Sequence, residues 1–381
     1  MNSELEQAFL EHFHGEPTHL VRAPGRVNLI GEHTDYNEGF VLPMAIDREV
    51  RITLRPRADR RVAVFSLDLN QSGEFDLDSL ERGEGWLEYL KGVAHELQIA
   101  NYKLEGWDGV ITGDVPRGAG LSSSAAVEMV TARAFASVSR FEWDAMALAR
   151  IGQRAENDWV GVNCGIMDQA VSAAAMAGHA LFLDCRTLEY KHVPLPKDVA
   201  VVVLDTSTRR GLVGSAYNER REQCERAARW FGARALRDVS VKELKERGKK
   251  KDGLDGLDAL AWKRAKHIIT ENERVLQAVK SMHNDDPVTL GRLFNESHAS
   301  LRDDFEVTND ALNQIVEIAQ GQSACYGARM TGAGFGGCAV ALVRQSQAGG
   351  FAEAVGAEFR RRSGLEAKVY VCQASEGASV V

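Results

Sequence analysis

The chain has no excess of basic residues. Its 381 residues include 46 lysines and arginines against 54 aspartates and glutamates, which gives a net charge of −8. Nucleic-acid-binding domains usually display clustered basic charge, so we expect no nucleic-acid partner. An anionic ligand would have to be bound by a few local positive groups.

Cysteine is scarce, and no pair of cysteines has the C-x-x-C spacing of a metal or redox site. Scattered cysteines of this kind are typical of reduced thiols in the cytoplasm, so we expect a cytoplasmic protein. The six are Cys164, Cys185, Cys224, Cys325, Cys338 and Cys372.

Long hydrophobic runs are also absent. The most apolar stretch, residues 166–183, contains Asp168, Gln169 and His179, which makes it a poor membrane span. The first ten residues carry acids where a signal peptide would be basic. There are no internal repeats, and 44% hydrophobic residues with 26% charged residues indicate an ordinary globular protein. At this length we expect two domains.

Residues 116–126, Pro-Arg-Gly-Ala-Gly-Leu-Ser-Ser-Ser-Ala-Ala, join a glycine turn to three hydroxyls and then to a helical pattern. Gly118 and Gly120 let an anion approach the main chain closely, and a helix beginning near Ser124 would aim free N–H groups at it. No lysine follows in the Walker register. The alternative is a tight turn with an ordinary serine cap.

A second polar cluster follows a short strand-like run at residues 27–30. Glu32, His33 and Asp35 stand within four residues, close in sequence to Arg26. Sugar hydroxyls both donate and accept hydrogen bonds, so such a cluster suits a polyhydroxyl ligand. A solvated loop with one Arg–carboxylate pair is the alternative.

Two further acids stand out. Glu156 lies in a helical pattern over residues 143–158, and Asp168 enters an apolar helix start. A carboxylate there must be partnered or belong to a site, so Asp168 is either a site residue or an N-cap or structural ion pair. Trp86 and Tyr89 share a helix face that packs in the core or stacks on adenine.

In the second half, residues 200–204 predict a buried strand, residues 211–218 a polar turn with Tyr217, and residues 242–256 a solvated charged excursion. Residues 332–337 fit G-x-G-x-x-G, but a strand-like run follows where a dinucleotide fold requires a helix. We therefore reject an NAD-dependent oxidoreductase. Together, the loop, the acids and Arg26 indicate phosphoryl transfer, which depends on positioning and charge neutralisation.

The same motifs resemble a known family. Residues 25–37 look like the signature of galactokinases, residues 116–126 like the nucleotide motif of the GHMP kinase superfamily, and residues 331–338 like its third motif. The resemblance covers essentially the whole chain. It implies an α+β fold of two domains, the first like ribosomal protein S5 domain 2 and the second ferredoxin-like, with ATP and sugar in the cleft between them. We place the domains at residues 1–196 and 197–381.

The resemblance also implies roles for individual residues. Asp168 would be the catalytic base for the C1 hydroxyl of galactose, with Arg26 as its partner, and Mg²⁺ would be bound by Ser124 and Glu156. The sugar would be bound by Glu32, His33, Thr34, Asp35, Gly165 and Tyr217, and the nucleotide by Ser66, Trp86, Tyr89, Gly118, Ala119, Gly120, Leu121, Ser122, Ser123 and Ser124.

The activity implied is ATP-dependent phosphorylation of galactose by a monomer. A kinase for galacturonate, arabinose or N-acetylgalactosamine is the nearest alternative. A non-catalytic galactose and ATP sensor is another, but sensors of this family resemble galactokinases with a shortened serine-alanine loop, and residues 121–126 are uninterrupted here.

Overall fold

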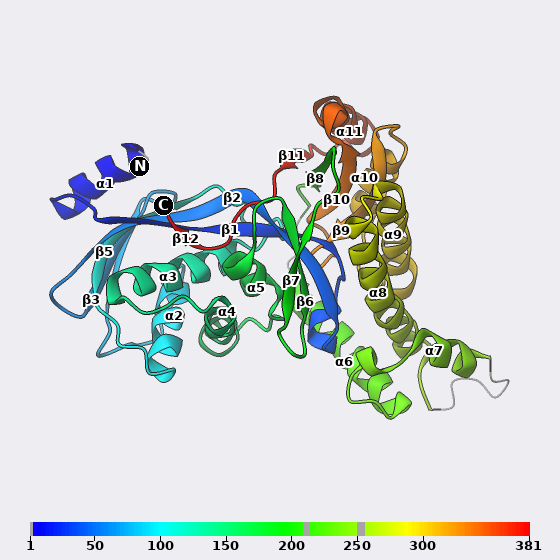
Figure 1. Ribbon diagram of the computed structural model, residues 1–381, viewed down its shortest axis with the longest axis horizontal. Helices are drawn as coiled ribbons and strands as arrows, with labels where there is room; N and C mark the ends of the chain where they lie inside the picture. The colour runs from blue at the N-terminus through cyan, green and yellow to red at the C-terminus, as the bar shows by residue number, and fades with distance from the viewer. Residues whose placement is uncertain (1–2, 209–212, 250–255) are drawn as a thin grey trace.

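The computed structural model describes residues 3–208, 213–249 and 256–381. Two sheets organise the chain, and helices pack against both (Figure 1). None of the helices within the described ranges is both long and apolar enough to span a membrane.

The larger sheet has eight strands, six of them in the order β12-β1-β2-β5-β3-β4. Strands β3 and β5 run parallel, the other pairs are antiparallel, and β6 and β7 extend the sheet from β2. The bounds are β1 His19–Ile30, β2 Phe40–Pro56, β3 Arg61–Ser66, β4 Gln71–Asp76, β5 Trp107–Gly113, β6 His179–Asp184, β7 Tyr190–Pro194 and β12 Ser379–Val380.

Helices cover this sheet on one face, and the N-terminal helix packs on it separately (Figure 1). Inside the main core, the ring of Trp107 in β5 packs edge to face against the ring of Phe135 in α3. Leu5 and Phe9 instead form a small separate core with Phe65. The helices are α1 Ser3–Phe13, α2 Leu87–Ile99, α3 Ser123–Ser139, α4 Ala145–Arg154 and α5 Met167–Ala174.

The smaller sheet has four antiparallel strands in the order β11-β8-β10-β9. Every residue of β8 is buried, which confirms the strand predicted from its apolar run. With helices after β8 and after β10, the order is that of a β-α-β-β-α-β ferredoxin-like unit. The bounds are β8 Val199–Asp205, β9 Cys325–Thr331, β10 Cys338–Arg344 and β11 Lys368–Cys372.

Six helices belong to this second half: α6 Val213–Phe231, α7 Val241–Gly248, α8 Ala259–His283, α9 Pro287–Ser300, α10 Asp310–Gln320 and α11 Ala348–Ser363. Short helical turns complete the chain. Those of 3-10 type are Asp35–Asn37, Leu236–Asp238 and Gln345–Gln347, and those of π type are Ala155–Val160 and Leu301–Phe305.

One local prediction is wrong. Tyr217 lies on a helix, α6, and not in a polar turn. Its ring packs within 5.2 Å of Tyr36 and 5.7 Å of His33, measured between ring centroids, and these contacts from the other half of the chain override the turn-like Gly, Ser and Asn pattern. Residues 209–212 of the predicted turn lie outside the described residues, as do residues 250–255 of the charged excursion.

The domain boundary stays a prediction. Pro194 ends strand β7 and precedes β8 by only a few residues. The C-terminal strand β12 returns to pair with β1 at Val21 and Arg22, so the last residues of the chain join the sheet of the first half (Figure 1).

Candidate active site

Arg26 and Asp168 meet at the centre of the molecule. Arg26 lies in β1, and Asp168 lies in the first turn of α5. Arg26 Nε donates to Asp168 Oδ1 at 2.7 Å and Arg26 Nη2 to Oδ2 at 2.6 Å. Two parallel bonds of this kind fix both side chains in one plane.

The glycine loop reaches the same pair. Arg26 Nη1 donates to the carbonyl oxygen of Gly120 at 2.6 Å, and the hydroxyl of Ser122 donates to Asp168 Oδ2. The backbone approaches closely because Gly25 has no side chain: a Cβ there would stand 2.7 Å from the carbonyl oxygen of Leu121. The β1–β2 register also shifts between Pro24 and Arg26, and irregularities of this kind re-aim side chains next to active sites.

A hollow of about 430 Å³ opens beside this pair. It gathers side chains from both halves of the chain, including most of the predicted catalytic and sugar-binding residues. Gly165 is required here, since a Cβ would lie 1.7 Å from Asp35 Oδ2. The lining includes Arg26, Glu32, His33, Asp35, Gly165, Asp168 and Tyr217, together with Gly332 and Ala333.

Thr34 does not line this hollow. Its side chain is buried, and its hydroxyl donates to the carbonyl oxygens of Gly31 at 2.8 Å and Phe40 at 2.7 Å. The hydroxyl therefore shapes the loop from within. The predicted contact between this side chain and the sugar has no support in the geometry.

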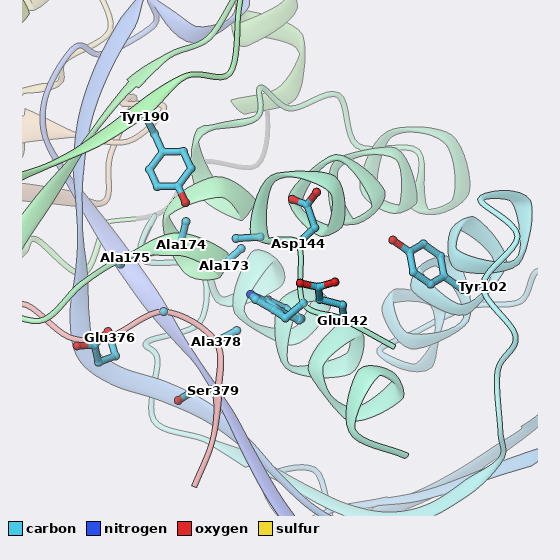
Figure 2. Close-up of a pocket in the computed structure, with 13 residues that line it drawn as sticks. Tyr102, Glu142, Asp144, Ala173, Ala174, Ala175, Tyr190, Glu376, Ala378 and Ser379 are labelled. Atoms are coloured by element: carbon cyan, nitrogen blue, oxygen red, sulfur yellow. The ribbon is translucent and has the colours of Figure 1, made fainter. Parts of the chain in front are cut away.

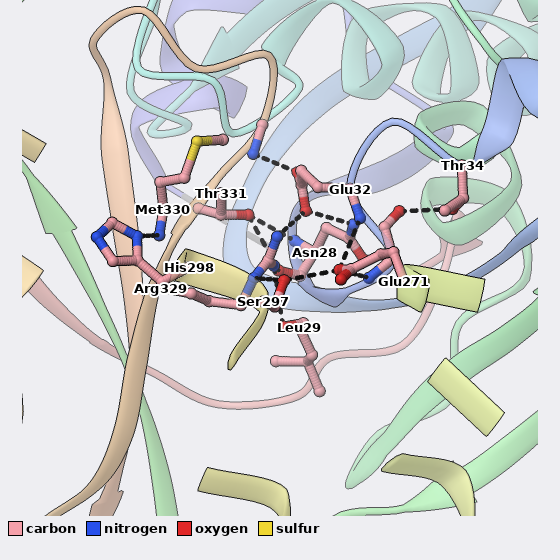
Figure 3. Close-up of polar contacts among 12 residues, drawn as sticks. Asn28, Leu29, Glu32, Thr34, Glu271, Ser297, His298, Arg329, Met330 and Thr331 are labelled. Carbon is pink, nitrogen blue, oxygen red and sulfur yellow. Dashed lines mark hydrogen bonds and ion pairs between the residues drawn. The ribbon is translucent and has the colours of Figure 1, made fainter. Parts of the chain in front are cut away.

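Glu32 is held from several sides (Figure 3). Its Oε2 accepts from Asn28 Nδ2 at 2.6 Å and from Arg329 Nη2 at 2.8 Å, and its Oε1 accepts from the backbone N–H of Gly332. The carboxylate thus ties β1 to the loop after β9. Burial raises the pKa of Glu32, and the charge of Arg329 acts in the opposite direction.

Arg329 is fully buried and was not predicted from the sequence. Its other N–H groups donate to the carbonyl oxygens of Asn28 and Leu29 and to the hydroxyl of Ser297 at 3.1 Å. Ser297 in turn donates to Glu271 Oε1 at 2.7 Å (Figure 3). These partners come from distant parts of the chain, so no local pattern signals them.

Protonation in the hollow follows from burial. Burial raises the pKa of Asp35 to about 6, and the nearby charges of Asp168 and Glu32 add to the rise. Burial lowers the pKa of His33 to about 3, so its imidazole is neutral near pH 7. His33 Nδ1 lies 2.9 Å from the hydroxyl oxygen of Tyr36, which fixes the ring.

The predicted phosphate loop has the expected backbone. Gly118 and Gly120 adopt φ angles of 68° and 77°, a left-handed conformation that suits glycine. Helix α3 begins at Ser123 with no side-chain cap from Ser122, so its first N–H groups are available to an anion. Leu121 and Ala119 are buried, and Leu121 accepts from the backbone N–H of Arg26.

A second hollow of about 200 Å³ lies on the other side of this loop. It gathers the side chains predicted for the adenosine end of a nucleotide and two serines of the loop, together with Arg117. The predicted residues in its lining are Ser66, Trp86, Tyr89, Ser123 and Ser124.

Glu156 lies in the π-helical turn that follows α4, and such turns are frequent at functional sites. Burial, followed by the charge of Asp168, raises the pKa of Glu156, and the neighbouring Ser124 hydroxyl acts in the opposite direction. A carboxylate and a hydroxyl suit Mg²⁺, which is usually bound by one or two protein groups and substrate phosphates. The described ranges hold no larger metal-binding cluster of three or more His, Cys, Asp or Glu.

A wider hollow, about 820 Å³, lies elsewhere and contains none of the predicted site residues. Figure 2 shows it beside the C-terminal segment, with Tyr190 and Glu376 on one side and Glu142 and Asp144 on the other. Size alone does not identify the active site, because the predicted catalytic, sugar-binding and nucleotide-binding side chains line the two smaller hollows.

Comparison with known proteins agrees with this geometry. Residues 7–56 match the galactokinase galactose-binding signature, residues 88–178 the GHMP kinases N terminal domain and residues 278–361 the GHMP kinases C terminal model. The Methanococcus jannaschii mevalonate kinase shares the fold, with a TM-score of 0.69, 18% identity and coverage of 95% of this chain and 100% of the other. The fold and the loop thus define a GHMP kinase.

Two relatives narrow the class. A galactokinase of Roseiflexus sp. (strain RS-1) is 47% identical over 99% of this chain and 97% of its own. The structure of Lactococcus lactis galactokinase complexed with galactose has a TM-score of 0.92 and 38% identity, and covers 99% of both chains. The chain belongs to the galactokinase family, and it is a kinase.

Proposed function

We propose that this enzyme transfers the γ-phosphoryl group of ATP to the C1 hydroxyl of α-D-galactose, giving galactose 1-phosphate and ADP. The observation that supports this best is the position of Asp168. Its carboxylate lines the sugar-sized hollow and also accepts a hydrogen bond from Ser122 of the glycine loop. A hydroxyl bound in the hollow and a phosphate bound at the loop would meet there.

In the proposed reaction, Asp168 orients the C1 hydroxyl and accepts its proton as the oxygen attacks the γ-phosphorus. The bond from phosphorus to the bridging oxygen breaks, and that oxygen leaves with ADP. Arg26 holds the Asp168 carboxylate through its two hydrogen bonds and places positive charge beside the phosphoryl group. The loop N–H groups at the start of α3 stabilise phosphate charge.

Ser124 and Glu156 are the proposed ligands of Mg²⁺. The ion, when bound with ATP, would neutralise charge on the β- and γ-phosphates. Glu156 lies in the π-helical turn after α4, and the Ser124 hydroxyl at the start of α3 is close enough to influence the pKa of its carboxyl group.

Charge supports a neutral sugar. The hollow is lined by three carboxylates, Glu32, Asp35 and Asp168. Arg26 pairs with Asp168 and Arg329 with Glu32, whereas no cation within the described residues forms an ion pair with Asp35. Galacturonate would add a fourth carboxylate to this hollow, so we propose that it is a poor substrate. Arabinose and N-acetylgalactosamine differ in bulk and not in charge, and they need a direct test.

We further propose that the protein acts in the cytoplasm, in line with cysteines that form no disulfide among the described residues, and that it is a monomer. The alternative of a sensor without catalytic activity is set aside, because the chain is a kinase. The uninterrupted loop at residues 121–126 and the paired Arg26 and Asp168 agree with this.

The experiment that tests the proposal identifies the product. The enzyme is incubated with ATP, Mg²⁺ and galactose, and coupled proton and phosphorus NMR locates the phosphate. We expect it on the anomeric oxygen, and we expect methyl α-galactoside, whose anomeric oxygen is blocked, to remain unreacted. Phosphate on another oxygen, or phosphorylation of the blocked sugar, would contradict the proposal.

A further inference from the structure

A buried polar cluster lies behind Glu156, and the reaction described above does not use it. Glu128 on α3 and Gln169 on α5 are both fully buried. Gln169 Nε2 donates to Glu128 Oε2 at 2.9 Å and to Glu156 Oε2 at 2.8 Å. The amide therefore uses both of its hydrogens to join two carboxylates.

Burying a carboxylate costs free energy of folding, so a cluster of this kind is uncommon where it has no function. Glu128 Oε1 and Gln169 Oε1 have no hydrogen-bond partner among the described residues, so the cluster costs free energy that an apolar core would not. The surroundings are tightly packed: a Cβ on Gly152 would stand 2.4 Å from Met129 Cε and 3.2 Å from Gln169 Cγ.

We propose that Gln169 and Glu128 are positioning residues for the proposed Mg²⁺ ligand. Glu128 fixes the orientation of the Gln169 amide, and the amide holds Glu156 Oε2, leaving the other side of that carboxylate toward Ser124. The proposal rests on the proposed roles of Ser124 and Glu156. Because Gln169 follows Asp168 directly, one turn of α5 would place both the base and the support of the metal ligand.

The test measures metal binding apart from turnover. Manganese is titrated into the enzyme saturated with a non-hydrolysable ATP analogue, and bound ion is followed by electron paramagnetic resonance. Outer partners of metal ligands typically contribute about 10–100-fold in affinity. We expect Gln169→Met to weaken manganese binding within that range, whereas the KM for galactose stays unchanged.

Glu128→Met separates positioning from folding. This change removes a buried carboxylate, so we expect the thermal unfolding midpoint to stay equal or rise, while manganese binding weakens. Ser172→Ala is the matched control. Ser172 is also buried on α5, and its hydroxyl donates to the carbonyl oxygen of Pro24 at 2.8 Å, so its loss should leave metal affinity unchanged.

A double variant tests whether Gln169 affects metal binding through Glu156. If Gln169 acts through Glu156, Gln169→Met added to Glu156→Gln should cause no further loss of manganese affinity. Wild-type manganese affinity in both Gln169→Met and Glu128→Met would overturn the inference alone. Wild-type affinity in Glu156→Gln would instead overturn the proposed metal site itself.

Discussion

Arg26 and Asp168 form a two-bond pair, with N–O distances of 2.7 and 2.6 Å, at the point where the sugar hollow meets the glycine loop. Arg26 is 5% exposed, whereas the Asp168 side chain is 26% exposed, so the guanidinium is shielded from solvent and the carboxylate faces the hollow. The guanidinium also donates to the Gly120 carbonyl oxygen. One side chain thus links β1, α5 and the phosphate loop.

Arg26→Lys is expected to lower kcat strongly, because an ammonium group cannot make the two parallel bonds and the bond to Gly120 together. Arg26 and Asp168 act as a unit, so the double variant with Asp168→Asn should be little slower than the slower single variant. Steady-state kinetics of the three variants checks this. Losses in kcat that multiply would show that the two residues act independently.

Gly165→Ala should weaken sugar binding. The added Cβ would lie 1.7 Å from Asp35 Oδ2 and would push this carboxylate out of place. We expect the KM for galactose to rise at least tenfold while the KM for ATP is unchanged. Gly350→Ala on α11 is the control, because a Cβ there meets nothing within 4 Å. Equal galactose KM values in both variants would contradict the proposed role of Asp35.

The pKa of Asp35, raised to about 6 by burial, predicts a pH dependence. Below pH 6 the carboxyl gains a proton, loses its charge and becomes a weaker acceptor for the sugar hydroxyls that we propose it binds. We expect kcat/KM for galactose to fall as the pH drops through about 6, since this ratio reports groups of the free enzyme. In Asp35→Asn the remaining kcat/KM should lose that inflection. An inflection that persists there would assign it to another group.

The same shift has a consequence for stability. The folded pKa of Asp35 lies above its ordinary value of 3.8, so the folded state binds the proton more tightly than the unfolded state. The contribution of Asp35 to stability is therefore full below about pH 4 and is lost as the pH rises through 6. Asp35→Asn should exceed the wild type in thermal midpoint at pH 8, with a difference that shrinks toward pH 4. A constant difference would contradict this linkage.

Arg329→Gln should destabilise the fold, because it leaves Glu32 buried without its positive partner. Breaking a buried ion pair typically costs about 3–5 kcal/mol, and urea unfolding would measure the loss. Arg360→Gln on the surface of α11 is the control, since the Arg360–Glu366 pair is exposed and 4.0 Å long. Equal unfolding free energies for both variants would show that the Arg329 pair contributes little.

Local patterns predicted much of the fold. The strand predicted from the apolar run of β8 and the strand predicted after the second glycine motif, residues 332–337, are confirmed. Strand β4 was missed because Gln71–Asp76 is polar and contains a glycine, and it is stabilised by pairing with β3. A turn was predicted at Tyr217 because the rings that it packs against, Tyr36 and His33, lie far away in the sequence.

Among the site residues, too, those recognised by local motifs were predicted and those held by distant partners were not. Motifs placed Arg26, Asp168 and the glycine loop, since their chemistry is visible in a few adjacent residues. Arg329 and Gln169 were not predicted, because their partners lie about 300 and 13–41 residues away. Thr34 stood inside a motif, yet its hydroxyl bonds to the backbone. Sequence adjacency could not separate a residue that touches ligand from one that shapes the loop.

The most direct test of the account is an ADP-release assay with ATP and Mg²⁺ against galactose, glucose, N-acetylgalactosamine, galacturonate and arabinose. The wild type should turn over galactose and leave galacturonate almost untouched. Asp168→Asn should lose about 10²–10⁴-fold in kcat, with galactose binding retained by calorimetry. Undiminished turnover in the variant would contradict the account. So would a wild type that binds galactose but turns over none of the sugars.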